Sequence, residues 1–261
     1  MGIVNVTPDS FSDGAIFADA NEAVEHGLRL VEEGADLLDV GGESTRPGAA
    51  PVTIDEEIAR VVPVIEGLVK QVDVPLSVDT RKADVAVAAL GGGAAIVNDV
   101  SAGADPDMFE VVHDRGGGMV LMHMKGDPTT MQDDPTYDDV VAEVRAFLAD
   151  RVESAVVAGV ARDHLCLDPG IGFGKTVEHN LALLHGIASF GELGLPVLVG
   201  ASRKRFVGTL TGVDDPGDRV EGSVAAAAWC AAQGVDIVRV HDVRPTVRAL
   251  RIVDAIVRGS A

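Results

Sequence analysis

The chain has 261 residues, 47% of them hydrophobic, and its 41 acidic against 21 basic residues give a formal net charge of −20. This size and apolar content suffice for one large domain with its own core, and so acidic a chain argues against a general binder of nucleic acids or anionic membranes. No apolar run approaches the roughly 18 residues of a membrane span, and Cys166 and Cys230 lack metal-ligand spacing, so we expect reduced thiols in a cytoplasmic protein.

Short β-branched runs alternate with longer amphipathic segments along the chain. The runs predict strands at residues 2–7, 37–40, 76–79, 95–98, 119–122, 164–168, 197–200 and 235–240. Helical spacing of apolar residues is clearest at 21–33, 54–68, 140–152 and 246–257. Thr53 and Glu56 have the spacing of a capping box, and Asp105 before Pro106 indicates an N-cap followed by proline at the first helical position.

The order of these elements predicts the fold. Eight strands and eight helical segments alternate strictly, with no linker between them, which is typical of βα units around a parallel sheet. We therefore predict a single (β/α)8 barrel over residues 1–261, with a doubly wound open sheet as the alternative. In such a barrel, the C-terminal ends of the strands form the active face.

Polar residues stand at nearly every predicted strand end. They are Asn5, Asp39, Asp79, Asn98, His123, Asp168, Lys204, Arg239 and His241. Each alone has an ordinary structural explanation: Asp39 can brace a loop, and Arg239 can form an ion pair with Asp236 or Asp242. Together they would leave many buried carboxylates and amides unpaired unless a ligand met them. The set predicts a ligand site at the barrel mouth.

The strand-end groups sort into two kinds by chemistry. Asp79, Asn98 and Asp168, with Lys204, can satisfy a flat heterocycle that bears several ring N–H groups and one carbonyl. A second set suits an anion such as phosphate. It comprises Arg46, Arg239, His241 and the turn amides around Gly14 and Gly48.

The turn at residues 168–175 has the look of a phosphate loop but fails both common patterns. A P-loop needs glycine where Pro169 stands, and the dinucleotide fingerprint needs one more residue before its last glycine. We therefore assign the function of this turn to Asp168. His123, between Met122 and Met124, is expected to be a packed strand-end histidine. We see no activated nucleophile, which favours catalysis by positioning and electrostatics.

Several of these motifs resemble, in order, those of the dihydropteroate synthase family. The matching stretches are residues 5–14, 42–48, 77–80, 98–100, 121–124, 168–175, 202–204 and 239–242. Similarity to this family implies condensation of 6-hydroxymethyl-7,8-dihydropterin pyrophosphate with 4-aminobenzoate, to give 7,8-dihydropteroate and pyrophosphate. It also implies a homodimer, while the acidic charge already argues against a nucleic-acid or membrane partner.

The resemblance also implies roles for single residues. Asp79, Asn98, Met122, Asp168 and Lys204 would line the pterin pocket. Asn5, Arg239 and His241 would handle the pyrophosphate, with Asn5 a ligand of Mg2+. The residues implied around the aminobenzoate are Thr45, Arg46, Pro47, Phe173 and Ser202.

Two rival interpretations share the barrel. A corrinoid-linked methyltetrahydrofolate methyltransferase also binds a pterin, but would not need residues 202–204 or Arg46. A non-catalytic pterin-binding protein would need the heterocycle site alone.

Overall fold

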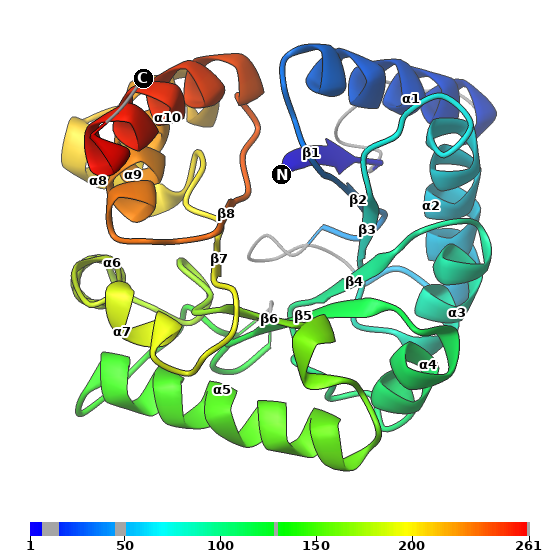
Figure 1. The fold of residues 1–261 in the computed structure, drawn as a ribbon, viewed down its shortest axis with the longest axis horizontal. Helices are drawn as coiled ribbons and strands as arrows, with labels where there is room; N and C mark the ends of the chain where they lie inside the picture. The colour runs from blue at the N-terminus through cyan, green and yellow to red at the C-terminus, as the bar shows by residue number, and fades with distance from the viewer. Residues whose placement is uncertain (7–15, 45–50, 128–129, 260–261) are drawn as a thin grey trace.

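A computed structural model describes residues 1–6, 16–44, 51–127 and 130–259, and within these ranges short parallel strands form a central barrel inside a ring of helices (Figure 1). The strands are β1 (Gly2–Asn5), β2 (Leu38–Gly41), β3 (Leu76–Asp79), β4 (Ile96–Asp99), β5 (Gly118–Met122), β6 (Leu165–Asp168), β7 (Leu198–Val199) and β8 (Ile237–Val238). No helix in the described ranges is both long and apolar enough to cross a membrane.

Strand pairing closes the barrel. Strands β1 to β6 pair with their neighbours in parallel, as do β7 and β8. Single bridges between Leu167 and Val197, and between Gly2 and Val240, join the two groups. The prediction of a (β/α)8 barrel is confirmed and the open sheet is wrong, because β8 returns to β1. Strands β7 and β8 are shorter than expected, with two residues each.

The helices follow the strands in order. They are α1 (Ile16–Glu32), α2 (Ile54–Leu68), α3 (Ala83–Gly91), α4 (Met108–Arg115), α5 (Val140–Val157), α6 (Val177–His185), α7 (Ala188–Gly191), α8 (Arg205–Thr211), α9 (Val220–Ala232) and α10 (Val243–Arg258). Two helices lie between β6 and β7 and two between β7 and β8, so the expected strict one-to-one alternation is wrong there. The capping box of α2 is confirmed at Thr53 and Glu56.

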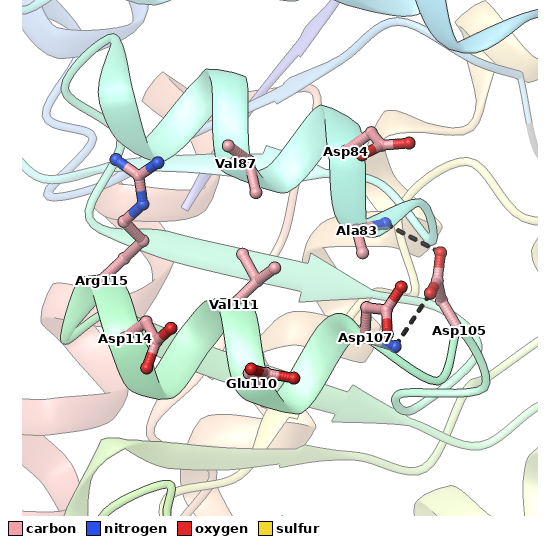
Figure 2. Close-up of a pocket in the computed structure, with 9 residues that line it drawn as sticks. All are labelled: Ala83, Asp84, Val87, Asp105, Asp107, Glu110, Val111, Asp114 and Arg115. Carbon is pink, nitrogen blue, oxygen red and sulfur yellow. Dashed lines mark hydrogen bonds between the residues drawn. The ribbon is translucent and has the colours of Figure 1, made fainter.

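The predicted cap at Asp105 is wrong. Helix α4 begins at Met108 after Asp107, and Asp105 instead accepts hydrogen bonds from the Ala83 amide at the start of α3 (3.0 Å) and from the Asp107 amide (3.1 Å). Asp105 thus ties α3 to the loop before α4. Figure 2 shows it at the end of an outer groove between these helices, lined by acidic side chains that include Asp84 and Glu110. The groove contains none of the predicted site residues.

The alternation of side chains along each strand sets the position of the site. Residues two apart on a strand point to the same side. Val120, Cys166 and Leu198 form a small buried cluster with Ile96 and Ile237 at its edge. The residues two positions further along these strands are Asn98, Met122, Asp168, Gly200 and Arg239. Four predicted site residues, Asn98, Met122, Asp168 and Arg239, therefore belong to the next layer toward the C-terminal mouth, above an apolar floor.

Candidate active site

The guanidinium of Arg239, just after β8, lies between two carboxylates of distant strands. Its Nε donates to Oδ2 of Asp39 on β2 (2.6 Å), and its Nη2 donates to Oδ2 of Asp79 at the end of β3 (2.8 Å). The same Asp39 oxygen accepts a hydrogen bond from Nδ2 of Asn98 on β4 (2.9 Å). The predicted alternative, in which Arg239 pairs with Asp236 or Asp242, is wrong.

Asp39 is the central member of this network, and its side chain is fully buried. The sequence placed it at a strand end without assigning it a role beyond bracing a loop. Its pairing could not be found from sequence, because Arg239 lies 200 residues further along the chain. Asp39 fixes the orientation of the Asn98 amide by binding its NH2 group.

Several acceptors at the mouth have no partner among the described protein atoms. They are Oδ1 of Asp39 and Oδ1 of Asn98, and the hydroxyl of Ser77 is also unpaired. Buried polar atoms are normally hydrogen-bonded, and an unpaired one costs about 1–3 kcal/mol. These acceptors therefore indicate a ligand that offers N–H donors, as the sequence predicted for a heterocycle.

Two ionisable groups have pKa values that are shifted toward neutrality. Burial raises the pKa of Asp79 to about 7, and the Arg239 charge opposes this shift while the Asp39 charge adds to it. Burial lowers the pKa of Lys204 to about 8, and the Asp168 charge opposes that shift. Strongly shifted groups gathered in one site are typical of ligand-binding and catalytic centres.

Asp168 and Lys204 meet around the turn that follows β6. Oδ1 of Asp168 accepts a hydrogen bond from the Gly170 amide (2.7 Å), and burial raises the pKa of this carboxyl while Lys204 opposes the shift. The Lys204 ammonium donates to the carbonyl oxygen of Ile171 and lies 4.5 Å from the centre of the Phe173 ring. The structure thus brings Phe173 and Lys204 together, although the sequence assigned them to different substrates, and Met122 is buried at the end of β5.

The loop after β7 brings Ser202 to His241. The Ser202 hydroxyl lies 3.0 Å from Nδ1 of His241 and accepts from the His241 amide (3.2 Å). Between Ser202 and Lys204, Arg203 has a left-handed backbone (φ 58°), a strained conformation for a side chain of this size. A bidentate pair with Asp242 (2.6 and 2.9 Å) holds Arg203 in place.

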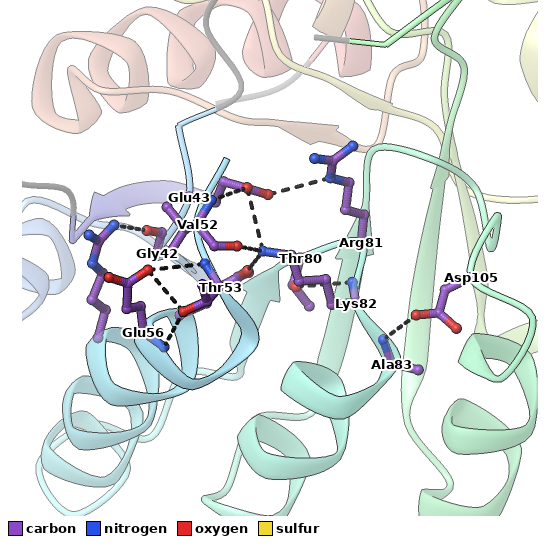
Figure 3. Close-up of polar contacts among 12 residues, drawn as sticks. Gly42, Glu43, Val52, Thr53, Glu56, Thr80, Arg81, Lys82, Ala83 and Asp105 are labelled. Carbon is purple, nitrogen blue, oxygen red and sulfur yellow. Dashed lines mark hydrogen bonds and ion pairs between the residues drawn. The ribbon is translucent and has the colours of Figure 1, made fainter. Parts of the chain in front are cut away.

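Thr45, Arg46 and Pro47, with Gly14 and Gly48, lie outside the described residues. The chain on either side of residues 45–50 is anchored to Arg81 and Lys82, which lie just before α3, as Figure 3 shows. Oε1 of Glu43 accepts from the Val52 amide (2.9 Å), and the Lys82 ammonium donates to the Val52 carbonyl (2.5 Å) and to the fully buried Glu57 (2.6 Å). Sequence reasoning missed this cluster. Breaking a buried ion pair typically costs about 3–5 kcal/mol, so the anchor is firm.

Asn5, the predicted metal ligand, ends β1 and is partly buried. A Cβ on Gly41 of the neighbouring strand would lie 3.8 Å from Oδ1 of Asn5 and 3.4 Å from Cβ of Asp79. The glycine thus keeps a small space open beside the amide oxygen. No three histidine, cysteine or acidic side chains cluster as a metal site within the described ranges.

The shifted pKa of Lys204 generates a prediction. We expect its ammonium to titrate near pH 8, because burial disfavours the charge. Replacement of the neighbouring carboxylate, Asp168→Asn, removes an opposing attraction and should lower the pKa further. Protein labelled with [13C]lysine has only five lysines to assign, and the Cε shifts follow the titration. A Lys204 pKa at or above 10, or no change in the variant, would contradict this account.

Comparisons with known proteins agree with this geometry. The family described as pterin binding enzyme matches residues 1–241. Dihydropteroate synthase of Escherichia coli (strain K12) is 47% identical over 255 residues, covering 98% of this chain and 90% of that protein. A Xanthomonas albilineans dihydropteroate synthase structure with 4-aminobenzoic acid has a TM-score of 0.93 at 53% identity (98% and 91% covered), and one in complex with 7,8-dihydropteroate has 0.89 at 50% (98% and 92%). This chain belongs to the dihydropteroate synthase family of pterin-binding enzymes.

Proposed function

We propose that this chain is a dihydropteroate synthase in folate synthesis. It condenses 6-hydroxymethyl-7,8-dihydropterin pyrophosphate with 4-aminobenzoate and releases 7,8-dihydropteroate and pyrophosphate. The observation that carries this proposal is that unsatisfied buried acceptors lie at the same barrel mouth as Lys204 and Arg239. Related dihydropteroate synthases have been solved with 4-aminobenzoic acid and with 7,8-dihydropteroate.

The pterin occupies the heterocycle side of the mouth. Asp79, Asn98 and Asp168 supply oxygen acceptors for the ring and amino N–H groups, and Lys204 donates to the ring carbonyl or a ring nitrogen. Met122, buried at the end of β5, supplies an apolar wall. The bond between Asp39 and the Asn98 NH2 group supports this assignment, because it leaves the Asn98 carbonyl oxygen for the ligand.

The pyrophosphate occupies the side formed by β1 and β8. Arg239 and His241 supply the positive and donor groups for an anion. Asn5 fits Mg2+, because its amide oxygen borders the space that Gly41 leaves open and oxygen ligands suit this ion. When bound, Mg2+ neutralises charge that develops on the leaving pyrophosphate.

The chemistry requires no protein nucleophile. As the pterin CH2–O bond breaks, its electrons leave with the pyrophosphate oxygen, and positive charge develops on the methylene carbon. Arg239 and His241 stabilise the departing anion, and the Asp79 carboxylate favours the cationic carbon. The aniline nitrogen of aminobenzoate then bonds to that carbon and loses a proton. With Lys204, which holds the pterin, these residues are the catalytic set.

The second substrate enters between the loops of β2, β6 and β7. We assign Phe173 and Ser202 to aminobenzoate, together with Thr45, Arg46 and Pro47. The anchored ends of residues 45–50 support this assignment, because they fix where that segment leaves and rejoins the barrel mouth. Phe173 is only partly buried, so its ring has a face available to a flat substrate.

The proposed activity predicts pyrophosphate release that requires both substrates and Mg2+. We expect Lys204→Ala to weaken pterin binding at least tenfold, because a charge-assisted donor is lost, whereas Lys70→Ala at an exposed site serves as the unchanged control. A coupled phosphate assay after pyrophosphatase treatment measures release, and calorimetry measures binding. Pterin binding without release would favour a non-catalytic binder, and methyl transfer from methyltetrahydrofolate without aminobenzoate-dependent release would favour the methyltransferase.

We further propose that the protein is a cytoplasmic homodimer. Large apolar side chains stay exposed on α8, α9 and α10, which lie together on one side of the barrel (Figure 1). They are Leu210, Trp229, Ile252, Ile256 and Val257. Such a patch typically marks an interface. Both cysteines are free and buried, as suits a reducing compartment.

The dimer is tested by sedimentation equilibrium. We expect twice the chain mass of 27.0 kDa at micromolar concentration and a dimer weakened at least tenfold by Ile256→Asp, because a charge on the patch must be desolvated. Val157→Asp, at an apolar residue of α5 that is exposed like Ile256 (88% against 74%), is the matched control. A wild-type monomer at 50 μM or so, far above usual dimer dissociation constants, would rule the proposal out.

A further inference from the structure

Lys175 ends the glycine-rich turn after β6, yet its side chain is only 3% exposed. The chain folds it back under its own turn, where Nζ lies 2.9 Å from Nδ1 of His123, 2.9 Å from the carbonyl oxygen of Phe173 and 3.3 Å from the carbonyl oxygen of His123. An ammonium has three donors. All three have acceptors here.

His123 can serve as an acceptor because its ring is neutral. Burial lowers the pKa of His123 to about 3, and the Lys175 charge acts in the same direction. The edge-on contact of the ring with Phe147 (4.9 Å between centroids) fixes its orientation. His123 is thus the packed histidine that the sequence predicted, with one further partner.

A buried lysine with no carboxylate in ion-pair contact is unusual. Within the described ranges no carboxylate forms an ion pair with Lys175, and burial lowers its pKa well below the ordinary value although the charge of the more distant Asp168 opposes this shift. Desolvation of an amine is costly, so a plain structural position would more readily take an apolar side chain. The three hydrogen bonds of Lys175 join His123, just after β5, to Phe173 in the turn after β6. Lys175 can therefore hold this turn in a fixed position against β5.

The turn that Lys175 holds carries groups that contact Lys204. The Ile171 carbonyl accepts from the Lys204 ammonium, and the Phe173 ring lies beneath it. Gly170 has a positive φ (68°), and a Cβ there would collide with the His123 carbonyl that Lys175 also binds. The turn therefore packs tightly against β5, and the Phe173 carbonyl points inward to Lys175 while its ring faces Lys204.

We propose that Lys175 is a positioning residue, which fixes the β6 turn so that the Phe173 ring and the Ile171 carbonyl stand against the Lys204 ammonium. Lys175 touches neither substrate; it acts through Phe173. The consequence for catalysis rests on the proposed function, in which Phe173 contacts aminobenzoate. The consequence for the geometry of the turn is independent of the proposed function.

The geometry is tested first, without substrates. The chain has seven phenylalanines, so protein labelled with 4-fluorophenylalanine gives few 19F signals, and Phe173→Leu identifies that of Phe173. We expect Lys175→Met, which keeps the length of the side chain and removes its donors, to shift or broaden the Phe173 signal. The signal of Phe147 should stay nearer its position, and Lys70→Met, at an exposed site, should change neither. An unmoved Phe173 signal in folded Lys175→Met would overturn the proposal.

Kinetics then separate positioning from a loss of stability. We expect Lys175→Met to raise the KM for aminobenzoate at least tenfold, with less than a threefold change in kcat, whereas a merely destabilised enzyme would lose kcat at unchanged KM. In a Phe173→Leu background the same substitution should change that KM less than twofold, since residues that act through one another are not additive. Multiplicative effects would overturn the proposal.

These experiments distinguish a failure of the proposed function from a failure of the role proposed for Lys175. If the wild-type enzyme shows no aminobenzoate-dependent release, the proposed function fails, while the 19F result still decides the role of Lys175. If Lys175→Met does not fold, Lys175→Gln retains two donors, and we expect it to give a smaller shift of the same Phe173 signal. An unmoved signal in Lys175→Gln would again contradict the proposal.

Discussion

The ion pairs of Arg239 with Asp39 and Asp79 are the constraint on which the mouth of this barrel depends. They join the last strand to the second and third, across 200 and 160 residues of chain. Such contacts form only when the barrel closes, because Arg239 reaches Asp39 only once β8 has returned beside β1. The backbone bonds from Ile3 to Val240 and from Val240 to Met1 (3.1 and 3.0 Å) hold that closure.

This network joins the two halves of the proposed site. In the function proposed above, Arg239 serves the anion and Asn98 the heterocycle, and one oxygen of Asp39 binds both side chains. An isolated buried ion is expensive, and breaking a buried pair leaves the remaining charge uncompensated. The positions of the guanidinium and the amide are therefore interdependent. An enzyme that breaks the bond between a pterin and a pyrophosphate needs both groups placed to within fractions of an ångström.

Much of this arrangement could be predicted from the sequence, because a strand and the polar residue at its end are recognised from a few neighbouring residues. Short apolar runs predict β3 and β6 close to their observed positions, and a carboxylate ends each run, Asp79 and Asp168. What failed depends on tertiary contacts. The cap at Asp105 was assigned from its neighbour Pro106, whereas the side chain instead bonds to the start of α3. The short helices α7 and α8 carry too few residues to show a period.

The partners of the charged side chains likewise depend on tertiary contacts and could not be predicted. Sequence spacing could not show that Asp39 would bind Arg239 and Asn98, or that Lys82 would bind the buried Glu57, because each partner comes from a different βα unit. The turn after β6 shows both what the sequence can indicate and what it cannot. Its failure to match a phosphate loop singles out Asp168, whose role stays a prediction, and the pattern carries no sign that Lys175 turns inward to His123.

The central claim is that Asp39 holds the two half-sites in one geometry. Its most direct test is the dissociation constant of a non-reactive pterin, and separately of pyrophosphate, measured by calorimetry for the wild type, Asp39→Asn and the exposed control Asp36→Asn. Asparagine has nearly the same shape but removes the charge that orients Arg239. We expect both ligands to bind at least tenfold more weakly to Asp39→Asn, about 1.4 kcal/mol, and normally to Asp36→Asn. Wild-type affinity for both ligands in a folded Asp39→Asn protein would contradict the account.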